Sequence, residues 1–364
     1  MIREPLKNLY NKETVTKLSK NIKESYTPFE EENFINSVLD HTWESLELKE
    51  RTNHIAINLR KFLPQNYKEA ISIIDKIIVN EPDWKESLCW YFPTFVEMYG
   101  LDMENWEISI FAMARYTRFA SAEFAVRPFI IKYQEKMMAQ MYEWSKSDDE
   151  HIRRLACEGC RPALPWGQVL SAFKKDPTPI LPILQQLKAD QDMYVKKSVA
   201  NNLNDISKTH PDLVTKIVKD WYGENPHTDW IVKHACRTLL KKGNPEVLSI
   251  FGFNDANGIE VSNFTVDKTS VPMGDSVNFS FRITTKEDTK VRLEYGMDFV
   301  KANGKHSRKI FQISEISLKA GQNKEYIKKH SFADLSTRKH YKGVHCALLI
   351  VNGRERGALE IELV

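Results

Sequence analysis

Apolar residues recur three and four positions apart over most of the first 250 residues of this 364-residue chain. Stretches such as ISIIDKIIV and WEISIFAMARY show this spacing and contain no glycine. One face of an α-helix repeats every 3.6 residues, so the pattern predicts amphipathic helices from about residue 30 to residue 250. From residue 258 onward, apolar and polar residues alternate in segments rich in Val, Ile, Phe and Thr, which predicts β-strands.

Three segments of the helical region resemble one another. They read HIRRLACEG from residue 151, YVKKSVANNL from residue 194 and IVKHACRTLL from residue 231. Their β-branched residues are 43 and 37 residues apart, which is near the period of HEAT-like repeats of paired helices. The residues before them, SDDE, ADQD and NPHTD, place Asp, Ser or Asn where a helix needs an N-cap. We therefore predict a HEAT-like helical-repeat solenoid, with an irregular helical domain as the alternative.

The C-terminal segments are typical of an all-β sandwich of immunoglobulin-like size. Only Cys346 lies among them, so an internal disulfide is excluded. The overall prediction is a mainly α chain, with a HEAT-like domain over residues 1–252 and a smaller immunoglobulin-like β-sandwich over residues 258–364. Basic segments at 303–309 and 338–342 leave two roles open for the sandwich, namely a stabilising appendage or a binding domain.

Charge is segregated along the chain, although the net charge is only +3. Residues 1–150 carry 19 Lys and Arg against 25 Asp and Glu, whereas residues 151–243 carry 15 against 9 and residues 258–364 carry 18 against 13. The middle and the end are basic by six and five charges, which suits a polyanion such as nucleic acid. The chain has no signal peptide and no apolar run of membrane-spanning length, and its five cysteines are scattered, so we expect a cytoplasmic protein that does not bind membranes.

The basic residues of the repeated segments follow directly after the expected caps. Arg153 with Arg154, Lys196 with Lys197, and Lys233 with His234 are expected to align across successive helices. Alignment of this kind would give a basic inner face that follows DNA phosphates. The alternative is that these charges form ordinary solvated helix faces.

The segment LACEGCRPALPWG, from residue 155, has three possible interpretations. The pair Cys157 and Cys160 suggests metal or redox chemistry, but no further cysteine or histidine pair completes a zinc site. Gly159 is expected to adopt a left-handed capping conformation, and the two prolines that follow it stop the helix. Neither explanation accounts for Glu158, which lies one helical turn after Arg154, or for Trp166, an aromatic residue on a stiff loop.

Four segments together resemble the AlkC branch of the HEAT-like-repeat alkylpurine DNA glycosylases. They are SAEFAVRPFI, WSKSDDEHIRRLACEGCRPALPWG, NNLNDISKTHP and DWIVKHACRTLLKKG. The resemblance is strongest over residues 100–245, and AlkC members with an immunoglobulin-like extension match the C-terminal region. Cys157 departs from the family pattern, in which a small residue, often Ser, is expected.

The resemblance implies excision of cationic bases, namely 3-methylcytosine, 1-methyladenine and 3-methyladenine, from alkylated DNA. It implies Glu158 and Asp205 as the best candidates for stabilising the sugar cation and positioning water, Glu123 as a third acid, and Trp166 as an aromatic contact to the cation. No cofactor, no metal and no obligate protein partner are implied, and no deep base pocket is expected. The candidate DNA contacts are Arg154, Arg161, Lys197, Lys233, His234, Arg237 and Lys241. The structural alternative for these residues is that the acids are solvated or salt-bridged and that Trp166 is buried. The alternative function is a non-catalytic HEAT-like scaffold that binds DNA structure or a protein partner.

Overall fold

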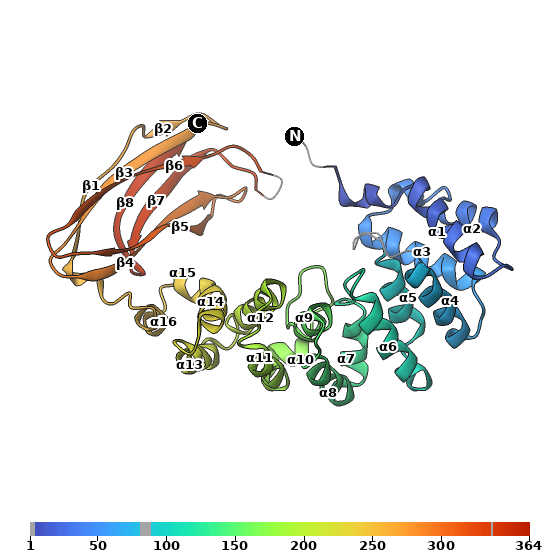
Figure 1. The fold of residues 1–364 in the computed structure, drawn as a ribbon. Coiled ribbons are helices and arrows are strands. Elements are labelled where there is room, and N and C mark those ends of the chain that lie inside the picture. Colours follow the sequence, from blue (N-terminus) through green and yellow to red (C-terminus); the bar gives the residue numbers. More distant parts are fainter. Residues whose placement is uncertain (1–3, 81–88, 336–337) are drawn as a thin grey trace. The chain divides into compact units, whose positions relative to one another are not determined.

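The computed structural model describes residues 4–80, 89–335 and 338–364 (Figure 1). The last helix before the strands ends at Ile250, and the first strand begins at Ile259. The chain divides into two compact units. The first runs to Thr209 and includes Gly223–Ala235, whereas the second combines His210–Tyr222 with Cys236–Val364. The predicted fold class, a mainly helical chain with a strand-rich C-terminal domain, is confirmed.

The α-helices carry the labels of Figure 1. Their bounds are α1 (Lys12–Ser25), α2 (Glu31–Val38), α3 (Leu48–Phe62), α4 (Tyr67–Asn80), α5 (Tyr91–Tyr99), α6 (Trp106–Tyr116), α7 (Val126–Lys132), α8 (Gln134–Trp144), α9 (Glu150–Glu158), α10 (Ser171–Lys175), α11 (Leu181–Leu187), α12 (Met193–Ile206), α13 (Pro211–Trp221), α14 (Pro226–Ala235), α15 (Arg237–Lys241) and α16 (Pro245–Ile250). Short 3₁₀ helices occur at Leu6–Leu9, Trp43–Ser45, Met103–Asn105, Thr178–Ile180 and Ala256–Gly258.

The three similar segments of the sequence fall on α9, α12 and α14. The side chains of Asp149, Asp192 and Asn225 accept backbone N–H groups in the first turns of these helices at 2.7–3.2 Å, as their sequence positions predict. Helix α9 contacts α8, α11 and α12, and α12 contacts α14. The similar segments are therefore neighbours within the first unit, and residues near the C-terminal ends of α9 and α12 can meet.

The strands form two sheets in the second unit, with orders β1-β3-β6 and β2-β8-β7-β4-β5. Their bounds are β1 (Ile259–Val266), β2 (Ser270–Val271), β3 (Ser276–Thr285), β4 (Thr289–Val300), β5 (His306–Leu318), β6 (Asn323–Ser331), β7 (Gly343–Val351) and β8 (Arg354–Leu363).

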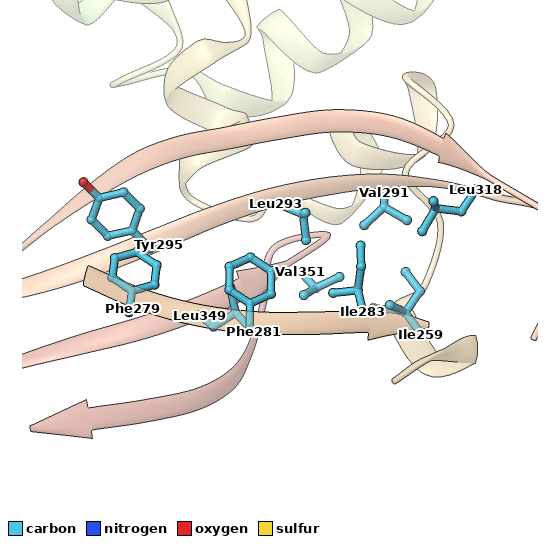
Figure 2. Close-up of a cluster of buried hydrophobic side chains, with 11 residues drawn as sticks. Ile259, Phe279, Phe281, Ile283, Val291, Leu293, Tyr295, Leu318, Leu349 and Val351 are labelled. Atoms are coloured by element: carbon cyan, nitrogen blue, oxygen red, sulfur yellow. The ribbon is translucent and has the colours of Figure 1, made fainter. Parts of the chain in front are cut away.

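A hydrophobic core joins the two sheets. Figure 2 shows Phe279, Phe281 and Ile283 of β3 beside Leu293 of β4 and Leu349 of β7. All five side chains are at most 2% exposed, and the three from β3 occupy every second position of that strand, as the alternating sequence predicts. All five cysteines are free thiols, so packing and not a disulfide stabilises this domain.

Candidate active site

The structure brings the three predicted acids into one buried network of the first unit. Glu123 precedes α7, Glu158 is the last residue of α9, and Asp205 lies in the last turn of α12. Their side chains are 13%, 7% and 2% exposed. Carboxylates buried to this degree need charged or polar partners, and the network supplies them.

Glu158 is fixed through both of its carboxylate oxygens. Its Oε1 accepts from Nη1 of Arg161 at 2.5 Å and lies 3.6 Å from Nη2 of Arg154. The contact with Arg154 is the one expected from residues four apart on a helix. Its Oε2 accepts from the hydroxyl of Ser198 on α12 at 2.6 Å. The carboxylate therefore joins α9 to α12 as well as to the loop that follows α9.

Asp205 is fixed in the same manner. The Nε and Nη2 atoms of Arg161 both lie 2.8 Å from Oδ2 of Asp205. Its other oxygen, Oδ1, accepts from Nζ of Lys208 at 2.8 Å. Arg161 thus bridges two of the predicted acids, Glu158 and Asp205.

Glu123 differs from the other two acids because its partners converge on one oxygen. Its Oε2 contacts Nη1 of Arg154 and accepts from the hydroxyl of Ser121 at 2.7 Å. Arg154 also donates to the Ser121 hydroxyl at 2.7 Å, and its guanidinium lies 4.7 Å from the ring centroid of Tyr194. Within the described residues, Oε1 of Glu123 accepts no hydrogen bond. Glu123 therefore combines a fixed position with an open acceptor.

The two arginines remain charged in this network. Burial lowers the pKa of Arg154 and of Arg161, but the neighbouring carboxylates outweigh it, so the net shift of each pKa is upward. For Arg154 those carboxylates are Glu123 and Glu158, and for Arg161 they are Glu158 and Asp205. Three carboxylates and two guanidiniums therefore compensate one another in a space largely closed to water, with Lys208 at the edge.

The loop after α9 exposes Trp166. Trp166 is 64% exposed, so the alternative that it is a buried packing residue is excluded. Its φ is +63°, a left-handed conformation that is uncommon for a residue with a side chain. The expected left-handed residue, Gly159, instead has φ −62° and ψ −30°, and that expectation is wrong. Gly159 is needed for space, because an added Cβ would lie 2.5 Å from Cγ2 of Val126.

Hydrogen bonds from Arg127 hold the backbone of this loop in place. It is fully buried, and burial lowers its pKa to about 10. Its Nη1 donates to the carbonyl oxygens of Gly159 at 2.8 Å and Arg161 at 3.0 Å, and its Nε donates to that of Gln168 at 2.5 Å. Both ends of the segment that carries Trp166 are therefore attached to one guanidinium.

Cys157 of α9 and Cys160 of the loop that follows it are both buried free thiols. Burial raises the pKa of Cys157 to about 12 and that of Cys160 well above its ordinary value. Cys160 donates to the carbonyl oxygen of Ala156 at 3.2 Å. Among the described residues, no cluster of three or more His, Cys, Asp or Glu side chains is arranged to bind a metal. These thiols therefore serve as small packing residues.

The predicted alignment of basic residues is only partly realised. Arg153 donates from Nε to Asp190 at 2.6 Å and from Nη1 to two backbone carbonyls, and Lys196 is 7% exposed beside Nδ1 of His227 at 3.2 Å. Neither faces solvent as a phosphate contact must, so the alignment is wrong for these two. Their neighbours are arranged differently, since Arg154 lies in the acid network and Lys197 is exposed.

The remaining predicted DNA contacts lie on α14 and α15. Lys233 is exposed, and His234 is partly buried with its ring stacked on Trp230 at 5.1 Å. In the second unit, Arg237 is partly buried and Lys241 is exposed on α15.

Sequence reasoning missed several residues that contact the network. Ser121 and Ser198 carry no recognisable signal, because a serine hydroxyl occurs in any surface loop or helix. Lys49 of α3 donates to the backbone oxygen of Trp166 at 2.6 Å, across 117 residues of sequence. No pattern in the sequence reveals a contact of that separation.

Comparison with known proteins identifies the family. Residues 115–239 match the model described as DNA alkylation repair enzyme, and residues 260–364 match the C-terminal Ig-like domain of the uncharacterised protein YhaZ. The uncharacterised YhaZ of Bacillus subtilis (strain 168) is 45% identical over 358 residues, which cover 98% of this chain and 99% of that protein. The alkylpurine DNA glycosylase AlkC of Pseudomonas fluorescens, bound to DNA containing an abasic site analog, is 33% identical, with a TM-score of 0.95 over 99% of this chain and 100% of the other. The chain belongs to the AlkC-type DNA alkylation repair enzymes.

The matched ranges follow the elements of this AlkC-type repair enzyme. All three acids and Trp166 lie within residues 115–239, and the Ig-like match begins within strand β1. Lys49 lies outside both ranges, although it contacts the Trp166 loop. No helix of the described residues meets the length and hydropathy that a membrane span requires.

Proposed function

We propose that the chain is a DNA glycosylase that hydrolyses the N-glycosidic bond of cationic N-alkylated bases such as 3-methylcytosine, 1-methyladenine and 3-methyladenine. One observation carries this proposal. The Glu123 carboxylate is fixed through Oε2 by Arg154 and Ser121, whereas Oε1 accepts nothing from the described residues. Membership of the AlkC-type family and similarity to an alkylpurine DNA glycosylase support the same function.

The chemistry of a cationic lesion suits a carboxylate without a strong general acid. Alkylation gives the base a positive charge, so the base takes the electron pair of the breaking bond and leaves without being protonated first. The sugar then carries positive charge, and a water attacks its C1′ atom. Oε1 of Glu123 accepts the proton of that water, and the carboxylate stabilises the sugar cation electrostatically.

Glu158 and Asp205 act mainly through the arginines in this mechanism. Each oxygen of these two acids already accepts at least one hydrogen bond, whereas Oε1 of Glu123 accepts none from the described residues. They fix Arg161 and help to fix Arg154, which in turn fixes Glu123. The exposed indole of Trp166 presents an aromatic face that attracts a cationic base or sugar.

The basic residues divide between two tasks. Arg154 and Arg161 fix carboxylates, because their guanidiniums are 13% and 8% exposed. The exposed Lys197, Lys233 and Lys241, with His234 and Arg237, are the proposed phosphate contacts. We propose that the β-sandwich binds distorted DNA through its basic segments at 303–309 and 338–342. In this proposal the lesion is excised without being flipped into a deep pocket.

The test is release of free methylated base from duplex DNA that contains a single 3-methyladenine or 3-methylcytosine. The purified chain is incubated in EDTA, and the released base is separated by chromatography. The Glu123→Gln variant is the matched control. Release by the natural chain and not by the variant supports the proposal. Salt-sensitive binding without any release would overturn it in favour of the scaffold that binds DNA without catalysis.

A further inference from the structure

The contact between Lys49 and Trp166 has no part in the chemistry proposed above. Lys49 lies in the first turn of α3, far from the acids in sequence, and its Nζ donates to the backbone oxygen of Trp166 at 2.6 Å. The same Nζ lies 4.2 Å from the ring centroid of Phe124, the residue directly after Glu123. One ammonium group therefore contacts both the segment of the proposed water-activating acid and the segment of the exposed indole.

Trp166 needs an external contact to keep its conformation. A left-handed φ is strained for a residue with a side chain, and burial of the indole does not offset this strain because Trp166 is 64% exposed. Arg127 fixes the backbone at Gly159, Arg161 and Gln168, that is, on either side of Trp166. Lys49 is the cation that contacts the Trp166 carbonyl itself.

The surroundings of Lys49 make this contact stronger than its exposed position suggests. Lys49 is an exposed residue, but its ammonium is partly removed from water, and this burial lowers its pKa. The charges of Glu97 and Glu123 raise the pKa of Lys49, and the charge of Arg127 lowers it. Lys49 also lines a cavity of about 120 Å³, together with Trp90, Glu97 and Phe124.

We propose that Lys49 is a positioning residue that sets the place of the Trp166 indole relative to Glu123. The inference rests on the proposed glycosylase function and adds a residue of the N-terminal helices to its machinery. Lys49 does not touch the reacting atoms. It fixes the backbone from which the indole projects, so that the aromatic face meets the cationic lesion in the position where Glu123 directs water.

The experiment compares variants in single-turnover excision at saturating protein, with affinity for undamaged duplex measured separately. Lys49→Met removes the ammonium and keeps the stem, and Lys49→Arg retains a cation. Lys61→Met is the matched control, because Lys61 is an exposed lysine of the same helix that donates to Asn58 at 3.0 Å. We expect Lys49→Met to slow excision about tenfold while affinity changes by less than about twofold, Lys49→Arg to recover most of the rate, and Lys61→Met to match the natural chain.

A double variant of Lys49 and Trp166 distinguishes a positioning role of Lys49 from a general effect of its loss on the excision rate. In a Trp166→Ala background, adding Lys49→Met should lower the rate no further. Any of three results would overturn the inference. They are a further tenfold loss of rate when Lys49→Met is added to Trp166→Ala, an unchanged excision rate in Lys49→Met alone, and a loss in Lys49→Met that is confined to DNA affinity.

Fluorescence gives a readout that does not depend on activity. The emission of Trp166, taken as the difference between each protein and its Trp166→Phe counterpart, should be quenched more by acrylamide after Lys49→Met than in the natural chain. Equal quenching would overturn the inference. If the natural chain releases no base, the proposed function fails, and this comparison still decides whether Lys49 fixes Trp166.

Discussion

Arg161 joins Asp205 of α12 to the end of α9, with its Nε and Nη2 atoms both 2.8 Å from Oδ2 of the carboxylate. The remaining nitrogen, Nη1, donates to Glu158 at 2.5 Å, so one side chain compensates two buried acids. Replacement of Arg161 by Met would leave both carboxylates buried without their main cation. We expect Arg161→Met to lower the free energy of unfolding by about 3 kcal/mol in urea denaturation.

Lys208→Met is the control for this prediction. Lys208 contacts the same carboxylate, but its side chain is 49% exposed, and exposed ion pairs contribute less than about 1 kcal/mol. Equal losses for the two variants would show that the burial of Arg161 does not matter to stability.

Glu123→Gln should separate catalysis from folding. The amide keeps the shape of the side chain and can still accept from Ser121 through its oxygen, but it takes no proton from water. We expect single-turnover excision of 3-methyladenine to fall at least about 100-fold, with little change in affinity for DNA. Glu158→Gln should slow excision and also lower stability, because both oxygens of Glu158 accept hydrogen bonds from buried groups. Full activity in Glu123→Gln would exclude its role as the proton acceptor.

The salt dependence of DNA binding tests the exposed lysines. Lys197 and Lys233 are exposed on α12 and α14. If each contacts a phosphate, replacing both by Ala should weaken binding to any sequence and reduce the slope of log K against log salt by about 2. The matched control replaces Lys20 and Lys76, which are exposed on α1 and α4 in the acidic N-terminal part. If the two double variants change the slope of log K against log salt equally, the phosphate contacts cannot be assigned to Lys197 of α12 and Lys233 of α14.

The sequence predicts local relationships well and distant ones poorly. Helical and strand periods, N-caps and the contact of Arg154 with Glu158 depend on residues at most four apart, and all of these are found in the structure. The direction of the Arg153 side chain was not predictable, because it depends on Asp190 in the segment between α11 and α12, 37 residues away in the sequence. The reason for a glycine at position 159 was not predictable either. Its backbone conformation suits any residue, and a side chain is excluded because it would collide with Val126 of α7.

The three acids were predicted through resemblance to a family, but the different roles that we propose for them depend on their partners. Ser198 and Lys208 occupy the second oxygens of Glu158 and Asp205, and nothing in the described structure occupies that of Glu123. Such a distinction arises from side chains that approach from other helices, and no single segment of the sequence contains it.

The stability of the β domain should depend on pH through His330. This side chain is 5% exposed among aromatic rings, with its Nδ1 3.1 Å from the hydroxyl of Tyr295. Burial, together with the nearby charges of His340, Arg338 and His345, lowers its pKa from 6.5 to about 4. The pKa values of His340 and His345 are also lowered, first by burial. All three rings are therefore neutral in the folded domain at neutral pH.

A lowered pKa in the folded state means that the unfolded chain binds protons first as the pH falls. The contribution of His330 is therefore complete above pH 6.5 and is lost between pH 6.5 and about 4, which amounts to on the order of 3 kcal/mol. NMR titration of the His330 ring in the full chain should give a pKa near 4, and urea denaturation should show stability falling over this range. His330→Gln removes the titrating group and should flatten the pH dependence. A ring that titrates near 6.5, or an unchanged slope in the variant, would contradict the prediction.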